Sequence, residues 1–508
     1  MRRISSILAG ICLLLSCVHP ALGQAKKSPL AFTLTSSEPT VSLWLAADSE
    51  GTTVSFSSCN SIQQQTIGQQ LKRIDIAMRC DTLRVYGHVS LVAMSEQSLA
   101  DMQASGTLRA MGYKISGTTR SSAQDEDGTS LIQWLSLPEG SSLRVVWCDH
   151  SLTGDLNIQN CNKLEVLKCP RASSMAGRAA GLDRINLSGC PNLRELDVAG
   201  NKLRHLDLRP CPKIRRVECN GNELESLNLS ASAALEVLNC AENRLRALDL
   251  KACTRLWWLD CNHNQLTALN VQPCALLRQL NCSHNTLANL NLSSSRNLTE
   301  LNCSNNTLST IDIQGCASLS WLNCSTNRIA RIASAQGNKL STLMCSKNLL
   351  ANLDLKAFPN LKKLQCAENG MDALDLRPCA ALESLDCSFN RIATLDLRPC
   401  PKLATLECVQ NKLTRLDLRP CKQLTKLACS GNKLDSLNPM GLQWLLCSNN
   451  NLKTLDISEC PALTLLQYKS GALLSTPEVV GREKCPSLRE LSETDNRCLP
   501  ATEEDWGK

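Results

Sequence analysis

The sequence predicts a solenoid of stacked repeats, in which each repeat adds one short strand to a long parallel sheet. Three observations favour this fold class. The pattern Leu-x-x-Leu-x-Cys recurs along most of the 508 residues, and every interval from Leu193 to Leu424 is 21 residues. Aromatic residues make up only 3% of the chain, too few for a large mixed core, and cysteine accounts for 30 residues. A fixed period of this length indicates repeat architecture.

The repeats share one register, counted from the first leucine of the pattern. Apolar residues occupy positions 1, 4, 6, 11, 14 and 16. We expect positions 4 to 6 to form a strand whose alternate residues point inward, and each repeat to bury its apolar edge only by stacking on the next. The copies begin at Leu143, Leu164, Leu193, Ile214, Leu235, Leu256, Leu277, Leu298, Leu319, Leu340, Leu361, Leu382, Leu403, Leu424, Leu442 and Leu463.

This spacing is the leucine-rich-repeat pattern L-x-x-L-x-L-x-x-[N/C]-x-L. Over about residues 143–468 the chain resembles bacterial surface proteins of the nested 21-residue class, and it is similar to the internalin J type, whose repeats also carry cysteine at the sixth position. The resemblance implies a leucine-rich-repeat solenoid with parallel strands on its concave face and irregular segments or second strands opposite. It implies a binding protein and does not identify the ligand.

Asparagine recurs at position 9, where the chain turns away from the strand. An amide that both donates and accepts can satisfy the backbone groups left there, so we expect a structural rather than a catalytic role. The members are Asn201, Asn222, Asn243, Asn264, Asn285, Asn306, Asn327, Asn348, Asn369, Asn390, Asn411, Asn432 and Asn450.

Most cysteines fall into two sets, at positions 6 and 19 of the repeat. Neighbours in register lie about 4.8 Å apart with parallel Cα–Cβ bonds, which keeps the Cβ atoms beyond the usual disulfide range. The sequence therefore predicts two ladders of free buried thiols, with scattered disulfides or a bound metal as alternatives. Outside the ladders, Cys59 with Cys80 and Cys485 with Cys498 are candidate disulfides of the two caps.

The two ends lack the 21-residue period. Residues 24–142 alternate apolar and polar residues in several segments, which predicts a small β-rich capping domain before the repeats of residues 143–468. For residues 469–508 we expect an irregular or short helical cap and a solvated tail.

The N-terminus is typical of an exported bacterial protein, secreted or held at the cell surface. Arg2 and Arg3 precede an apolar stretch and a small-x-small site ending at Gly23, which predicts a signal peptide over residues 1–23. Alternatively, residues 14–17 resemble a lipobox, and Cys17 is then acylated as a lipid anchor. The apolar stretch is too short for a transmembrane helix.

The charge and motifs exclude several function classes. The net charge of +7, which falls to +5 without residues 1–23, provides no concentrated basic footprint for nucleic acid. No motif for a nucleotide, a catalytic metal or a serine nucleophile occurs, so we expect no enzyme, cofactor or metal. His263 and His284, both at position 8, are interpreted as turn residues rather than a metal pair. An enzyme or inhibitor built on residues 24–142 is the remaining alternative in that class.

A candidate ligand patch lies on the concave face, where positions 2, 3 and 5 project. It comprises Trp257, Trp258, Trp321 and Trp444 with Arg215, Arg216, Arg278, Lys362 and Lys363. Exposed tryptophan and arginine are typical of binding sites, so we expect an adhesin-like protein that recognises a protein or glycan. Two alternatives stay open: the indoles merely cover the sheet, and the chain is a structural solenoid of the envelope. A ladder of Arg377, Arg398 and Arg419 beside Asp375, Asp396 and Asp417 is expected to neutralise itself.

Overall fold

The computed structural model describes residues 28–36, 40–59, 61–79, 82–86, 88–94, 114–115, 132–148, 154–171, 181–469 and 476–490. The chain divides into two compact units, unit 1 up to Leu235 and unit 2 from Glu236 onward. The predicted signal peptide, Cys17, Cys80 and Cys498 lie outside the described residues.

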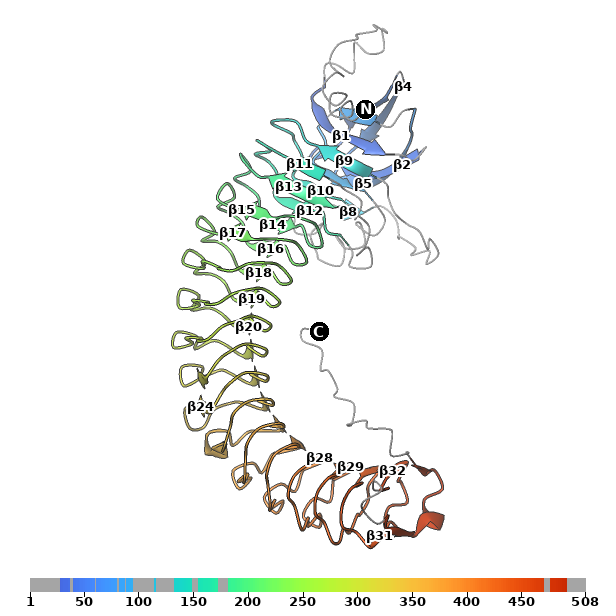
Figure 1. Cartoon of the computed structure of the whole chain (residues 1–508). Coiled ribbons are helices and arrows are strands. Elements are labelled where there is room, and N and C mark those ends of the chain that lie inside the picture. The colour runs from blue at the N-terminus through green and yellow to red at the C-terminus, as the bar shows by residue number, and fades with distance from the viewer. Residues whose placement is uncertain are drawn as a thin grey trace, which may run out of the picture. The chain divides into compact units, whose positions relative to one another are not determined.

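Unit 1 contains two sheets (Figure 1). The first has the order β4-β3-β6-β1-β9-β11-β13, and successive pairings make the second β8-β5-β2-β7-β10-β12-β14-β16. A short parallel pair, β15 with β17, lies apart from both. The strands are β1 (Leu30–Ser36), β2 (Thr40–Ala46), β3 (Thr52–Ser58), β4 (Ser61–Ile67), β5 (Gln70–Ala77), β6 (Thr82–Tyr86), β7 (Leu91–Ala93), β8 (Lys114–Ile115), β9 (Ile132–Ser136), β10 (Val145–Trp147), β11 (Gly154–Asn157), β12 (Val166–Lys168), β13 (Leu182–Asn186), β14 (Glu195–Asp197), β15 (His205–Asp207), β16 (Arg216–Glu218) and β17 (Ser226–Asn228).

The strand-rich N-terminal region is hydrogen-bonded directly to the first repeat. Strand β7 pairs in parallel with β10, and β9 pairs in parallel with β11, so both sheets of the repeats continue into this region. Trp147 of the first repeat is only 5% exposed and clusters with Trp44 and Ala93 of β2 and β7. Continuing the two sheets protects the first repeat, whose apolar edge has no earlier repeat to stack on.

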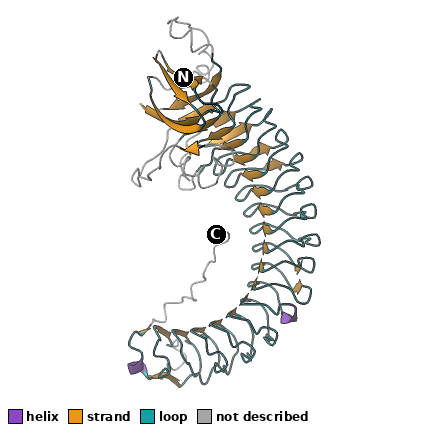
Figure 2. Cartoon of the chain, turned by 180° about the vertical axis from the view of Figure 1, so that it is seen from behind, coloured by secondary structure: helices purple, strands orange, loops and turns teal. Residues whose placement is uncertain are grey.

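Unit 2 is a stack of turns in which one strand per turn joins a long parallel sheet (Figure 2). That sheet is formed by β18 (Val237–Asn239), β19 (Trp258–Asp260), β20 (Gln279–Asn281), β21 (Glu300–Asn302), β23 (Trp321–Asn323), β25 (Thr342–Met344), β26 (Lys363–Gln365), β27 (Ser384–Asp386), β28 (Thr405–Glu407), β29 (Lys426–Ala428), β30 (Trp444–Leu446), β32 (Leu465–Gln467) and β34 (Arg489–Glu490). The opposite side has two short parallel pairs, β22 (Thr310–Asp312) with β24 (Arg331–Ala333) and β31 (Thr454–Asp456) with β33 (Glu478–Val480), and the 3-10 turns η2 (Leu355–Ala357) and η3 (Arg482–Lys484).

The predicted repeat register is confirmed, but the strand lies one residue earlier than expected. It spans positions 3 to 5, as in Ser384–Asp386, rather than positions 4 to 6. The reason lies at position 6. The Cys261 N–H still donates to the next turn, at 2.8 Å from Asn281 O, but the Cys261 carbonyl accepts from the side chains of Asn264 and Asn285 instead of from a strand. The backbone ladder therefore ends at position 5.

The position 9 asparagines have the predicted structural role. In Asn285, Nδ2 donates to Cys282 O of its own turn at 3.2 Å and to Cys261 O of the preceding turn at 3.0 Å. Its Oδ1 accepts from Leu266 N at 2.9 Å. Asn306 repeats this pattern one turn later with Cys303, Cys282 and Leu287. Each amide thus satisfies backbone groups in two adjacent turns, which a hydroxyl or an apolar side chain could not do.

Both predicted cysteine ladders are present as free, buried thiols in the described part of the chain. Burial raises the pKa of Cys282 and of Cys324 to about 12. A thiol that does not ionise is neither a good nucleophile nor easily oxidised, so these residues act as small apolar side chains. Cys59 is disulfide-bonded, while its predicted partner Cys80 lies outside the described residues.

Cys485 does not form the candidate disulfide with Cys498, because it is a free buried thiol. Its Sγ lies 3.2 Å from Cys460 O, the same contact that Cys421 Sγ makes with Cys400 O at 3.4 Å. Strand β34 also pairs with β32, and β33 with β31. Cys485 is therefore the last described member of the position 19 ladder, in a further turn where we expected an irregular cap.

A third ladder, not expected from the sequence, occupies position 8. All its members have a left-handed backbone with φ between 48° and 71°, including residues other than glycine, which pay a steric cost there. The conformation turns the chain so that the asparagine at position 9 points back under the strand. The members are Gly200, Gly221, Glu242, His263, His284, Asn305, Thr326, Lys347, Glu368, Phe389, Gln410, Gly431 and Asn449.

Candidate binding surface

Three of the predicted tryptophans lie in one row across the long sheet of unit 2. Trp258, Trp321 and Trp444 all occupy position 3, where strand pairing places residues of successive turns side by side. Trp258 and Trp321 are separated by three strand spacings, or about 14 Å. Trp444 lies six further strands away, roughly 29 Å beyond Trp321. Trp444 therefore lies well apart from Trp258 and Trp321 along the row.

Trp444 already has local partners. Lys426 Nζ lies 4.4 Å from the centre of its ring, a cation–π contact. The indole also packs with Leu465 against the buried side chains of Ala428 and Leu446. This arrangement matches the alternative in which an indole covers the sheet, so Trp444 is a weaker candidate for ligand contact than Trp258.

The predicted basic residues do not form one group either. Arg215 and Arg216 belong to unit 1, where Arg216 pairs with Glu218 at 2.6 Å. In unit 2, Lys362 pairs with Glu383 at 3.3 Å. Arg278 is exposed, and it makes no ion pair with any residue that the structure describes. Its guanidinium is the one of this set that is most available to a ligand.

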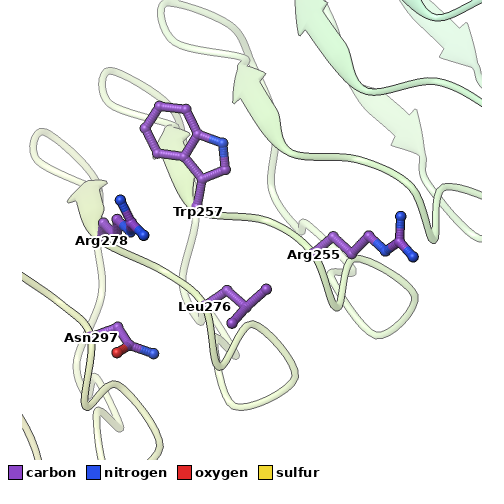
Figure 3. Close-up of a pocket in the computed structure, with 5 residues that line it drawn as sticks. All are labelled: Arg255, Trp257, Leu276, Arg278 and Asn297. Atoms are coloured by element: carbon purple, nitrogen blue, oxygen red, sulfur yellow. The ribbon is translucent and has the colours of Figure 1, made fainter.

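Arg278 and Trp257 line a pocket of about 380 Å³ beside the row. The other lining residues are Arg255, Leu276 and Asn297, so the five side chains come from three successive turns (Figure 3). Trp257 is 37% exposed and Leu276 is 50% exposed, which places them among the most exposed large apolar side chains of the described chain. Arg255 is also exposed, without an ion pair among the described residues.

Sequence reasoning identified two of these five residues and missed the other three. Trp257 and Arg278 occupy position 2, which was expected to project from the sheet. Arg255, Leu276 and Asn297 occupy position 21, the last residue before the next repeat, which was not considered part of the surface. Leu276 directly precedes the buried Leu277 of the pattern, so two adjacent leucines hid an exposed one.

Acidic side chains lie on the same sheet, in the position 5 row. Burial and, to a smaller extent, the neighbouring Asp386 raise the pKa of Glu407 to about 7, against the opposing effect of Lys426. Burial also raises the pKa of Asp386. Asp386 accepts from Ser388 N at 3.0 Å, as other position 5 side chains accept from position 7, so this row mainly shapes the turn after each strand.

The arginines of the opposite surface are neutralised, as expected. Arg377, Arg398 and Arg419 bond the aspartates two residues before them, with Nη2–Oδ2 distances of 2.6, 2.8 and 2.8 Å. His263 and His284 stack with ring centres 3.9 Å apart. Parallel rings present faces rather than nitrogen lone pairs to each other. Within the described ranges, no group of three or more candidate metal ligands occurs.

Solved structures identify the class of protein. The chain is 30% identical to the functional domain of InlJ from Listeria monocytogenes, with a TM-score of 0.53, and the match covers 57% of this chain and 67% of that one. That domain is described as including a cysteine ladder, the feature found here at positions 6 and 19. The chain belongs to the leucine-rich-repeat family. The likeness to internalins inferred from the repeat pattern is thus confirmed.

Two other neighbours share the leucine-rich-repeat fold. A leucine-rich-repeat protein of Leptospira interrogans is 21% identical with a TM-score of 0.51, and the match covers 69% of this chain and 90% of that one. YopM of Yersinia enterocolitica is 24% identical with a TM-score of 0.51, covering 71% and 89%. No family model matches the sequence, and no curated protein matches it. The only helices in the described ranges are three-residue turns, and none could span a bilayer.

Proposed function

We propose that this leucine-rich-repeat protein is an exported, adhesin-like binding protein that recognises a macromolecular partner through the long sheet of unit 2. The observation that supports this most is the pocket around Trp257. An exposed indole, an exposed leucine and two arginines without an ion pair among the described residues adjoin the row that contains Trp258 and Trp321. The fold needs none of these side chains at those positions, and such groups are typical of protein-binding sites.

Export is the second part of the proposal. It is supported by the signal-peptide pattern of residues 1–23, and the buried thiols are compatible with it. Because burial raises the pKa of ladder cysteines such as Cys282 and Cys324, these thiols would remain reduced outside the cell without disulfide exchange. Mass spectrometry of the mature N-terminus distinguishes cleavage before Gln24 from acylation of Cys17. An intact N-terminus on cytoplasmic protein would contradict export.

The binding proposal is tested by crosslinking capture with the mature protein, using extracts of candidate host and bacterial surfaces. The test variant combines Trp258→Ala with Trp321→Ala, and Trp444→Ala is the matched control from the same row. We expect the double variant to lose capture of a specific partner and Trp444→Ala to retain most of it. Sensitivity of the captured partner to glycosidase treatment separates a glycan ligand from a protein ligand.

Two results would count against this function. Equal capture by the wild type and the double variant would remove the row of Trp258 and Trp321 from the binding site. Capture of no partner by any form would favour the alternative of a structural solenoid of the envelope, since the partly buried Trp258 and Trp321 would then simply cover the sheet.

A further inference from the structure

We infer that the pocket formed by Arg255, Trp257, Leu276, Arg278 and Asn297, called here the Trp257 pocket, binds an extended peptide segment in which a carboxylate lies next to an apolar side chain. This inference rests on the proposed binding function and narrows its ligand to a protein of stated local chemistry. It follows from the charge, the apolar surface and the size of the pocket.

The charge of the pocket requires an anionic ligand group. Arg255 and Arg278 both line it, both are exposed, and neither is paired with a described acidic residue. By contrast, the arginines of the Asp-Leu-Arg-Pro segments each bond an aspartate of their own turn. A guanidinium prefers a carboxylate, which it can bind through two parallel hydrogen bonds. The two guanidiniums flanking one pocket therefore favour a carboxylate there.

The apolar surface of the pocket requires an uncharged ligand group next to that carboxylate. Trp257 and Leu276 expose 37% and 50% of their surface, and they lie between the two arginines in sequence and in successive turns. Exposed apolar surface of this kind gains free energy only when a ligand covers it. Asn297 adds an amide at one side, where its Nδ2 already donates to Ala275 O at 3.0 Å, which leaves Oδ1 to accept from a peptide N–H.

The size of the pocket matches a short piece of extended chain. Its residues span three successive turns, or about 10 Å at the strand spacing, which is the length of roughly three residues of extended peptide. A sulfated polysaccharide fits less well because it needs a longer series of cations. The next residues along position 2, Thr299 and Ser320, are uncharged, and so is Ser318 along position 21. In the other direction along position 2 the acidic Glu236 precedes Trp257, so the adjoining residues of these two rows in unit 2 add no further cation.

The test uses ligand-observed NMR on the full mature chain with four short synthetic peptides. One contains glutamate next to leucine, one glutamine next to leucine, one glutamate next to serine, and one glutamine next to serine. We expect the affinity for the first peptide, measured by titration of its saturation-transfer signal, to be at least tenfold higher than the affinity for any of the other three. Arg255→Gln and Arg278→Gln should each weaken its binding about 10-fold, equal to about 1.4 kcal/mol, and Trp257→Ala about 30-fold.

The matched control is Arg415→Gln, which removes the same charge from an exposed arginine of a distant turn and should leave binding unchanged. The inference is overturned if the four peptides bind alike, if none binds, or if a heparin oligosaccharide binds at these arginines while the acidic–apolar peptide does not. It is also overturned if Arg415→Gln weakens binding as much as Arg278→Gln does.

The outcome is separable from that of the proposed function. Partner capture lost in the Trp258 and Trp321 double variant, with no peptide bound at the Trp257 pocket, would sustain the function and reject this inference. Peptide binding that depends on Arg255 and Arg278, with no partner captured from any extract, would sustain this inference and count against the proposed function.

Discussion

Replacing a single ladder asparagine tests the account of how the turns are held together, and Asn285 is the most informative position. Asn285→Ala removes the acceptor of the Leu266 N–H, which is bonded at 2.9 Å to Oδ1. The carbonyls of Cys261 and Cys282 lose one donor each but keep another, from Asn264 and Asn306. One buried N–H is therefore left without a partner, at a cost of about 1–3 kcal/mol, and the lost bonds to the carbonyls add about 1 kcal/mol.

Asn285→Asp separates shape from hydrogen-bond direction. The carboxylate can still accept from Leu266 N, but its second oxygen faces the carbonyls of Cys261, Cys282 and Ser283, to which the amide now donates at 3.0 to 3.2 Å. Burial and these carbonyls raise the pKa of the new carboxyl above its unfolded value near 3.9. The contribution of the protonated carboxyl to the stability of the Asn285→Asp variant is therefore full below about pH 4, and it is lost as the pH rises through the raised folded pKa.

Hydrogen exchange followed by mass spectrometry measures both variants, because it reports local opening in a repeat protein whose turns need not unfold together. At neutral pH we expect the amides of the turns containing Leu266 and Asn285 to exchange about 30- to 700-fold faster in Asn285→Ala than in the wild type, which corresponds to 2–4 kcal/mol. Asn289→Ala, at an exposed position of the same turn, should exchange like the wild type. Exchange of Asn285→Ala at the wild-type rate, or a pH-independent Asn285→Asp, would refute the account.

Three further outcomes follow from the same structure. Iodoacetamide at pH 8 should not modify the ladder thiols of the native protein, since burial raises the pKa of Cys282 and Cys324 to about 12. In the denatured protein all of these thiols should be alkylated, and intact mass spectrometry distinguishes the two results. Ser295→Cys should raise stability by about 1 kcal/mol in denaturant unfolding, because the buried Ser295 hydroxyl has no hydrogen-bond partner among the described residues and a thiol is less polar. Mainly because of burial, the pKa of Glu407 is raised to about 7, above its unfolded value near 4.3, so its stabilising contribution is full below about pH 4 and is lost as the pH rises through 7. Glu407→Gln should therefore flatten the dependence of the unfolding free energy on pH by on the order of 1 kcal/mol. A pH profile of stability unchanged from the wild type would show that Glu407 is solvated.

The sequence was sufficient to predict the repeat, its register and its buried ladders, because each of these is set by residue type at a fixed spacing. The asparagines at position 9 are an example, since their amide chemistry and their recurrence both point to backbone hydrogen bonds. The strand was placed one residue late because its end depends on Asn264 and Asn285 taking the Cys261 carbonyl, a contact between turns.

Other features could not be predicted because residue type does not indicate them. Position 8 is left-handed in Phe389 and Lys347 as much as in Gly200, and neither phenylalanine nor lysine is typical of that conformation. Cys485 follows Cys460 by 25 residues, so its place in the ladder was hidden by a longer interval. The sequence places Trp258, Trp321 and Trp444 on one surface, but it does not indicate the contacts that Lys426 and Leu465 make with Trp444, because these depend on neighbouring turns.

The Trp257 pocket alone would bind a peptide weakly, and this has a consequence for the whole surface. Covering the exposed parts of Trp257 and Leu276 is worth about 2 kcal/mol each, and two charge-assisted hydrogen bonds contribute about 1.5–3 kcal/mol apiece before the cost of association. A partner held firmly must therefore also contact the row of Trp258 and Trp321. Trp321 lies about 14 Å from Trp258, far enough from the pocket for independent effects. Losses of partner affinity from Arg278→Gln and Trp321→Ala should then add in free energy within about 0.5 kcal/mol, as measured by titration of the captured partner. A double variant no weaker than the worse single one would show that a partner uses one of the two regions but not both.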